Sequence, residues 1–63
     1  MKIKPKETYG NFCKRIRYAC KFTQEQLAEE IGVSKSSIFL FESGKTPSLG
    51  NQRKIDEYAK TVK

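Results

Sequence analysis

The fold is decided by residues 23–41, TQEQLAEEIGVSKSSIFLF, in which two short helical patterns meet at a glycine. Apolar residues at helical spacing mark one face of each pattern: Leu27, Ala28 and Ile31 in the first, Ile38 and Phe41 in the second. Gly32 between them can adopt the left-handed conformation that ends a helix, so the chain can turn within about three residues. The stretch therefore predicts two amphipathic helices joined by a tight turn, with both apolar faces buried.

Both of these helices also carry start signals. Thr23 and Gln26 have the spacing of a capping box, in which each side chain accepts a hydrogen bond from the backbone amide of the other residue. Ser34 is placed so that its hydroxyl can accept from a free amide of the second helix. Val33 falls at the turn, where its side chain can fill the corner.

Helical patterns on either side extend this pair to four helices. We expect them over residues 9–21, 24–31, 34–42 and 49–61. The expected apolar faces are Tyr9, Cys13, Ile16 and Cys20, with Phe12 and Ala19 beside them, in the first helix, and Leu49, Ile55, Tyr58, Ala59 and Val62 in the fourth. Thr8 is an N-cap for the first helix, and Pro47 with Ser48 begins the fourth.

The residues of the motif resemble a known family. The positions that carry the resemblance are Thr23, Gln24, Leu27, Ala28, Gly32, Val33, Ser34, Ile38, Glu42, Gly44 and Pro47, and more weakly Gly10, Ile16 and Arg17. This pattern is similar to the helix-turn-helix of the phage-repressor and Cro type, the lambda-repressor-like fold, over about residues 9 to 60. The resemblance implies an all-α, compact four-helix domain over residues 8–62, with the motif at 23–42. Most members have a fifth helix, often in a dimer interface, and here at most a vestigial one is expected.

The resemblance also implies roles for individual residues. Arg17 is expected to form a structural ion pair with Glu42, tying the first helix to the third. The expected DNA-binding residues are Thr23, Gln24, Ser34, Lys35, Ser36, Phe39, Leu40, Ser43, Lys45 and Thr46. Those at the start of the supporting helix and in the loop after the second motif helix would contact phosphates. Those on the outward face of the second motif helix would face base edges in the major groove.

The composition describes a small, basic chain with an uneven charge. Its 63 residues make one domain, and the 13 basic and 7 acidic side chains give a net charge of +6, which favours polyanionic partners. Residues 1–22 carry seven basic side chains and one acidic, whereas residues 23–50 carry two basic and four acidic. The motif is therefore net negative, which argues against very tight binding to DNA.

Residues 1–7 form a short, basic N-terminal arm interrupted by Pro5. One interpretation is a frayed, solvated terminus. The other is a flexible cationic arm that reaches phosphates or a minor groove. The sequence leaves both open.

Catalytic, metal and membrane functions have little support. Cys13 and Cys20 lie seven residues apart on one helix, with Cα atoms about 10 Å apart, which is too far for a disulfide. The chain has no histidine, no phosphate-cradling loop and no nucleophile beside a base, so we expect no enzyme activity, metal or cofactor. No apolar run approaches the roughly 18 residues of a membrane span, and we expect a cytoplasmic protein.

Phe39 and Leu40 depart most clearly from the polar side chains that many relatives carry at these positions. Apolar side chains there can contact thymine methyl groups, or they can form an exposed patch that binds protein. The leading hypothesis is a sequence-specific DNA-binding transcriptional regulator of the small phage repressor or Cro type, and the family implies a homodimer on a palindromic operator. The alternative is an antirepressor-like modulator that binds a repressor or other regulator through Phe39 and Leu40.

Overall fold

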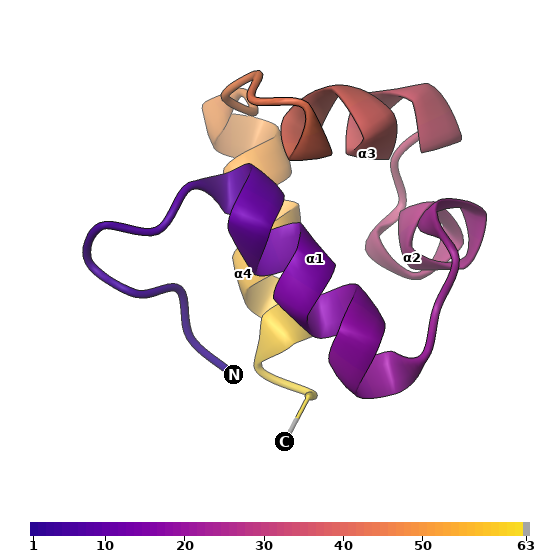
Figure 1. Ribbon diagram of the computed structural model, residues 1–63, viewed down its shortest axis with the longest axis horizontal. Helices are drawn as coiled ribbons and strands as arrows, with labels where there is room; N and C mark the ends of the chain where they lie inside the picture. The colour runs from indigo at the N-terminus through magenta and orange to yellow at the C-terminus, as the bar shows by residue number, and fades with distance from the viewer. Residues whose placement is uncertain (63) are drawn as a thin grey trace.

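The computed structural model describes residues 1–62, which form four helices and no strand (Figure 1). The helices are α1 (Tyr9–Cys20), α2 (Gln24–Ile31), α3 (Lys35–Glu42) and α4 (Leu49–Ala59). This confirms the expected all-α, four-helix architecture. Each helix begins and ends within two residues of the predicted bounds.

The predicted helix starts and the predicted turn of the motif are present. The Thr23 hydroxyl accepts from the Gln26 amide at 3.1 Å, and the Gln26 side chain accepts from the Thr23 amide at 2.8 Å, which completes the capping box. Ser34 accepts from the Ser37 amide at 3.1 Å. Gly32 ends α2 with a φ of 91°, a conformation open to glycine without steric cost. Local chemistry therefore accounts for the turn between α2 and α3.

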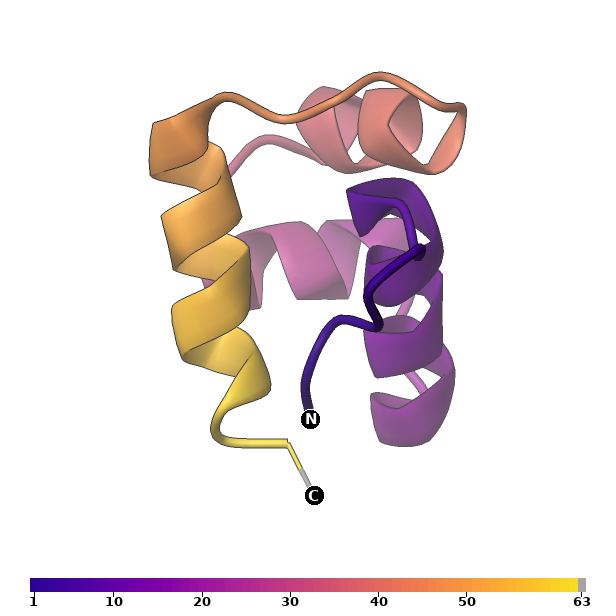
Figure 2. The same ribbon diagram turned by 90° about the vertical axis from the view of Figure 1, so that its left-hand side faces the viewer.

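All four helices contribute to a single core. Its buried hydrophobic residues are Phe12, Cys13, Ile16, Leu27, Ala28, Ile31, Ile38, Phe41, Ile55 and Ala59. In Figure 2, α3 lies across one end of the molecule, and α1 and α4 run away from it on either side. Helix α3 packs against α1 and α2, so one side of α3 is buried and the opposite side is left outside the core.

The start of α1 makes an unusually close approach to the end of α3. A Cβ atom added to Gly10 would lie 2.0 Å from the backbone carbonyl oxygen of Phe41, far inside van der Waals contact. Gly10 itself is buried. Glycine is therefore required here by the packing of two backbones.

Alanine substitutions at two helical glycines should have opposite effects on stability, because a Cβ atom has no room at Gly10 and ample room at Gly50. We expect Gly10→Ala to lower the free energy of unfolding by about 2–3 kcal/mol because the backbones of α1 and α3 must separate. Gly50→Ala, in the first turn of α4 where a Cβ meets nothing within 4 Å, should raise it by about 0.5–1 kcal/mol. Urea denaturation measures both. A Gly10→Ala variant as stable as the wild type would contradict the close approach.

Neither interpretation of the basic N-terminal arm fits the structure. The Met1 amino group donates to the backbone oxygens of Ala59 at 2.9 Å and Val62 at 2.6 Å, at the end of α4. The side chains of Met1 and Ile3 pack against the core. The apolar residues that alternate with the lysines thus dock the segment, and it is neither frayed nor extended toward a partner.

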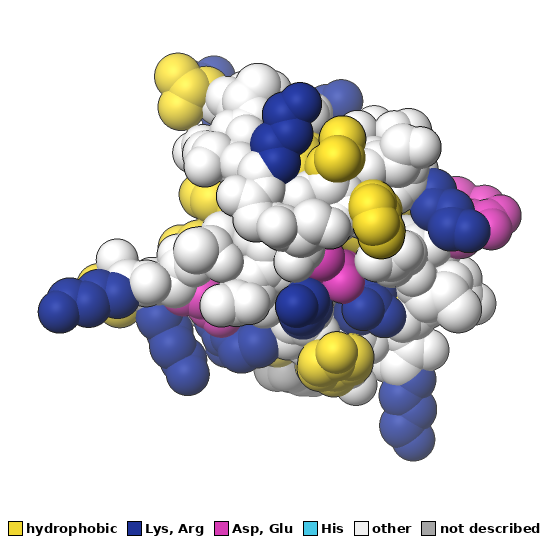
Figure 3. All heavy atoms as spheres, turned by 45° about the horizontal axis from the view of Figure 1, so that its top comes forward, with side chains coloured by type: hydrophobic (Ala, Val, Ile, Leu, Met, Phe, Trp, Pro, Cys, Tyr) yellow, Lys and Arg dark blue, Asp and Glu magenta, His cyan; other side chains and the backbone are white. Residues whose placement is uncertain are grey.

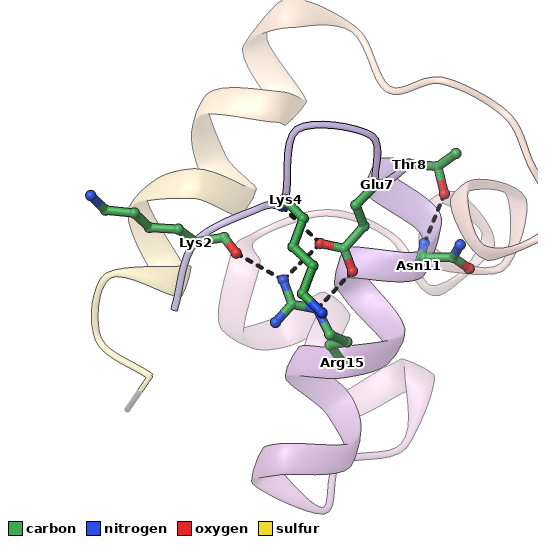
Figure 4. A network of polar contacts seen from close by, with 6 residues as sticks. All are labelled: Lys2, Lys4, Glu7, Thr8, Asn11 and Arg15. Carbon is green, nitrogen blue, oxygen red and sulfur yellow. Dashed lines mark hydrogen bonds and ion pairs between the residues drawn. The ribbon is translucent and has the colours of Figure 1, made fainter.

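A polar network completes this docking (Figure 4). Arg15 of α1 forms two hydrogen bonds with the Glu7 carboxylate, at 2.6 and 2.7 Å, and a third with the Lys2 carbonyl at 2.8 Å. The Lys4 amide donates to Glu7 at 3.1 Å. The hydrogen bond from Arg15 is the main cause that lowers the pKa of Glu7. One of the basic side chains of α1 is therefore engaged within the protein.

The predicted burial of two residues on the apolar faces, Leu49 and Ala19, is wrong. The Leu49 side chain is 77 % exposed, and Ala19 is exposed as well. Leu49 precedes Ile55 by six residues, which places it about 120° away around the helix from that buried side chain. The pattern of α4 was too loose to show that Leu49 points away from the core.

Candidate nucleic-acid interface

Helix α3 presents a row of side chains outside the core. Lys35, Ser36, Phe39 and Leu40 are all exposed, with Phe39 at 56 % and Leu40 at 42 %. They share one side of the helix because residues three and four apart lie next to each other. The outward face that the sequence predicted is therefore present, and these four residues are called the α3 face below.

The start of α2 adds to this surface. A shallow hollow beside the α3 face is lined by Gln24, Lys35, Ser36, Phe39 and Leu40. The view over α3 in Figure 3 shows hydrophobic side chains among basic ones. The structure thus brings Gln24 together with all four residues expected to face bases.

An ion pair fixes the end of α3 to α1. Nε and Nη2 of Arg17 donate to the two carboxylate oxygens of Glu42, each at 2.8 Å, and Nη1 donates to the Phe22 carbonyl at 3.3 Å. The two charged side chains are 16 % and 5 % exposed. The hydrogen bonds to Glu42 are the largest cause that raises the pKa of Arg17. The pair implied by the family resemblance is present, and it keeps the Glu42 charge neutralised beneath the α3 face.

The remaining candidate side chains of the motif are partly engaged within the protein. Nε2 of Gln24 lies 3.4 Å from the Glu42 carboxylate, a long hydrogen bond. The hydroxyls of Thr23 and Ser34 accept the capping bonds at the starts of α2 and α3. The Thr23 hydroxyl can still donate its own hydrogen to a partner. The Ser34 hydroxyl also lies 2.9 Å from the Ser37 hydroxyl, so the two can hydrogen-bond to each other. Their capping roles are thus shown, and their contacts with DNA stay a prediction.

The loop after α3 carries the other candidates. The Ser43 hydroxyl donates to the Phe39 carbonyl at 2.8 Å, so it closes the end of the helix. Lys45 and Thr46 are exposed. The Lys45 amide donates to the Leu40 carbonyl at 3.0 Å, which places Lys45 directly after the α3 face.

The first turn of α1 lies beside this loop, a proximity that the sequence did not predict. A hollow between them is lined from α1 by Tyr9 and Gly10 and from the loop by Lys45 and Thr46, with Gln52 of α4 at its edge. The one available signal was Gly10, since a glycine inside a helical pattern often marks a close backbone approach. The partner of that approach could not be read from the sequence.

The two cysteines, Cys13 and Cys20, form no disulfide. Both thiols are free, and Cys13 is buried in the core. Burial is the largest cause that raises the pKa of Cys13 to about 12, which keeps the thiol protonated near neutral pH. Within residues 1–62, no group of three or more potential metal ligands lies together, and no helix has the length and apolar character to cross a membrane.

The geometry defines the class of protein. Two short helices meet at a glycine turn, and the second presents an exposed face next to a loop that carries Lys45, which is the arrangement of a helix-turn-helix DNA-binding domain. The sequence model of a helix-turn-helix family matches residues 14–60. The chain therefore belongs to the lambda-repressor-like helix-turn-helix family, whose domain is a DNA-binding domain of transcription regulators. Comparisons with curated proteins and with solved structures gave no match.

The role of the ion pair can be tested with a double-mutant cycle. The single variants are Arg17→Met and Glu42→Leu. We expect Arg17→Met to lower the free energy of unfolding by about 2–4 kcal/mol because it leaves the Glu42 charge shielded from water without a partner. Removing both charges, in Arg17→Met with Glu42→Leu, should restore most of that loss. Urea denaturation of the single and double variants gives the coupling energy. Effects that simply add would show that the two side chains do not stabilise each other.

Proposed function

We propose that this protein is a sequence-specific DNA-binding transcriptional regulator of the small phage repressor or Cro type, which inserts α3 into the major groove of an operator. The observation that carries the proposal is the α3 face, where four neighbouring side chains are exposed on a helix fixed at both ends. The Ser34 cap and the Gly32 turn fix its start, and the Arg17–Glu42 pair fixes its end. A rigid helix with an exposed side can present the same side chains to each base pair it meets.

The α3 face supplies a small set of base contacts. Lys35 can donate to O6 and N7 of guanine, and Ser36 can donate or accept. Phe39 and Leu40 can make apolar contacts with bases. Only two of the four side chains can hydrogen-bond, so we expect a short recognition sequence with few strictly specified positions.

Contacts with the phosphate backbone would fix the orientation of α3. Gln24 and Thr23 stand at the start of α2, where the free amides and the positive end of the helix dipole favour an anion. Lys45, Ser43 and Thr46 lie in the loop that follows α3. Gln24 lines the same hollow as the α3 face, and Lys45 follows the end of α3, so both groups are near enough to contact the phosphate backbone beside the groove.

The family resemblance adds a homodimer to this proposal. Two copies on a palindromic operator would place their α3 helices in successive major grooves, with half-sites separated by about 34 Å. Nothing in the described residues identifies the surface that joins the copies, so the dimer rests on the resemblance alone.

The two lysines at the ends of α3 are expected to act differently. Lys35→Ala should weaken binding to a duplex enriched from a random pool by about 1–3 kcal/mol and relax the choice of base at one position. Lys45→Ala should weaken binding to that duplex and to a scrambled one by the same factor, and should reduce the salt dependence by about one phosphate contact. Mobility-shift titrations at several salt concentrations measure both effects.

Lys60→Ala is the matched control, since Lys60 is an exposed lysine beyond the end of α4 that pairs with Glu57. Its removal should leave the preference for the enriched duplex unchanged. Equal effects of Lys35→Ala on enriched and scrambled duplexes would contradict a base contact by Lys35.

The exposed apolar residues favour a second candidate function. In this alternative, Phe39 and Leu40 press against a repressor or another regulator, as in an antirepressor-like modulator. The excess of acidic side chains in residues 23–50 also favours a protein partner over DNA. The two candidates are separated by mobility shift at low salt with the random pool. Failure of folded protein to retard or enrich any duplex would support the modulator.

A further inference from the structure

We propose that Phe39 and Leu40 recognise the 5-methyl groups of thymine, so that operator binding depends on those methyl groups and not only on hydrogen bonds to base edges. This inference rests on the proposed function and names the chemistry that the α3 face selects. It makes Phe39 and Leu40 specificity-determining residues, although neither can form a side-chain hydrogen bond.

The α3 face has few groups that can form hydrogen bonds with bases. Its two polar members are one ammonium and one hydroxyl, and its other two members are an exposed aromatic ring and an exposed isobutyl group. It has no amide or carboxylate, the groups that read adenine and cytosine, and Lys35 is its one group that reads guanine. The neighbouring Gln24 amide is directed to the Glu42 carboxylate, 3.4 Å from its Nε2. The Glu42 carboxylate at its end is held by Arg17 and is 5 % exposed. Half of the face is therefore suited only to an apolar partner.

The major groove offers one apolar group at base-pair edges, the 5-methyl of thymine. Cytosine presents an amino donor at the neighbouring position, and guanine presents two acceptors. An apolar side chain over those edges would leave a donor or acceptor without a partner after water is excluded, which is unfavourable. Over thymine, the same side chain covers a methyl group. The α3 face thus discriminates by contact with methyl groups and by the cost of unpaired polar groups.

Basic side chains lie at both ends of this apolar pair, which favours DNA as the occupant. Lys35 precedes Phe39 by one helical turn. The backbone N–H of Lys45 donates a hydrogen bond to the Leu40 carbonyl at 3.0 Å, which holds Lys45 near Leu40 at the end of α3. A polyanion can be held at both ends while the apolar pair faces its groove. An apolar protein surface would not by itself pair with these cations, whereas the phosphates beside a major groove can pair with both.

Helical spacing also suggests the order of the contacted bases. Lys35 and Phe39, and likewise Ser36 and Leu40, are four residues apart, a rise of about 6 Å along the helix. Successive base pairs are about 3.4 Å apart along one strand. A guanine contacted by Lys35 is therefore expected within about two base pairs of a thymine contacted by the apolar pair.

The test uses the duplex that the wild-type protein enriches most strongly from a pool of random duplexes. Each thymine is replaced in turn by deoxyuridine, which removes the 5-methyl group and keeps base pairing. We expect one or two positions at which the replacement weakens binding about fourfold, the equivalent of about 0.8 kcal/mol for one buried carbon. The other thymines should change affinity by less than about twofold, since nothing buries their methyl groups.

Protein variants link this effect to the α3 face. Phe39→Ala and Leu40→Ala, tested singly, should each lose discrimination between thymine and deoxyuridine at one sensitive position. Both side chains are exposed, so the variants should fold, which circular dichroism checks. Leu49→Ala is the matched control, because Leu49 is an exposed leucine on α4 outside the α3 face. It should keep the full discrimination of the wild type.

The outcomes separate this inference from the proposed function. An enriched duplex that tolerates deoxyuridine at every thymine would overturn methyl recognition and leave the DNA-binding function in place. Discrimination that persists in both alanine variants would also overturn it, because another residue would then contact the methyl group. Failure to enrich any duplex would overturn the proposed function, and the inference with it.

Discussion

The ion pair between Arg17 and Glu42 joins α1 to the last residue of α3 through two hydrogen bonds of 2.8 Å. It acts together with the close approach at Gly10, where the backbone of α1 lies against the carbonyl of Phe41. These contacts fix the end of α3, and the turn at Gly32 fixes its start. The pair also removes a negative charge from the surface that we propose meets DNA. One interaction therefore serves both the rigidity of α3 and its electrostatics.

The buried and exposed residues of α3 have different roles. Ile38 and Phe41 belong to the core, and the α3 face carries no part of it. Stability and recognition thus depend on different residues of one eight-residue helix. In a domain of this size, which usually has only a few kcal/mol of stability, the buried residues can tolerate little change. The α3 face lies outside the core, so substitutions there should change the stability of the fold little, and recognition can be altered largely independently.

Much of the fold could be predicted because its signals are local. Caps such as Thr23 and Ser34 and the apolar spacing of the motif give the helix bounds and most of the core. What could not be predicted depends on contacts distant in sequence. The docking of residues 1–7 requires the end of α4, and the need for glycine at position 10 requires the end of α3. For the candidate site, exposure of the α3 face followed from helical spacing, whereas the internal bonds of hydroxyls such as Ser43 did not.

If a rigid α3 presents Lys35, Ser36, Phe39 and Leu40 to the major groove, α3 must lie at the centre of the surface that contacts DNA. The most direct measurement is a two-dimensional 15N NMR titration of the protein with the enriched duplex. We expect the largest shift changes at the amides of α3 and of residues 43–46, with little change at core positions such as Ile55. Changes centred on α4 or on residues 1–7, with α3 unaffected, would place the DNA contact elsewhere on the protein and exclude α3 as the recognition helix.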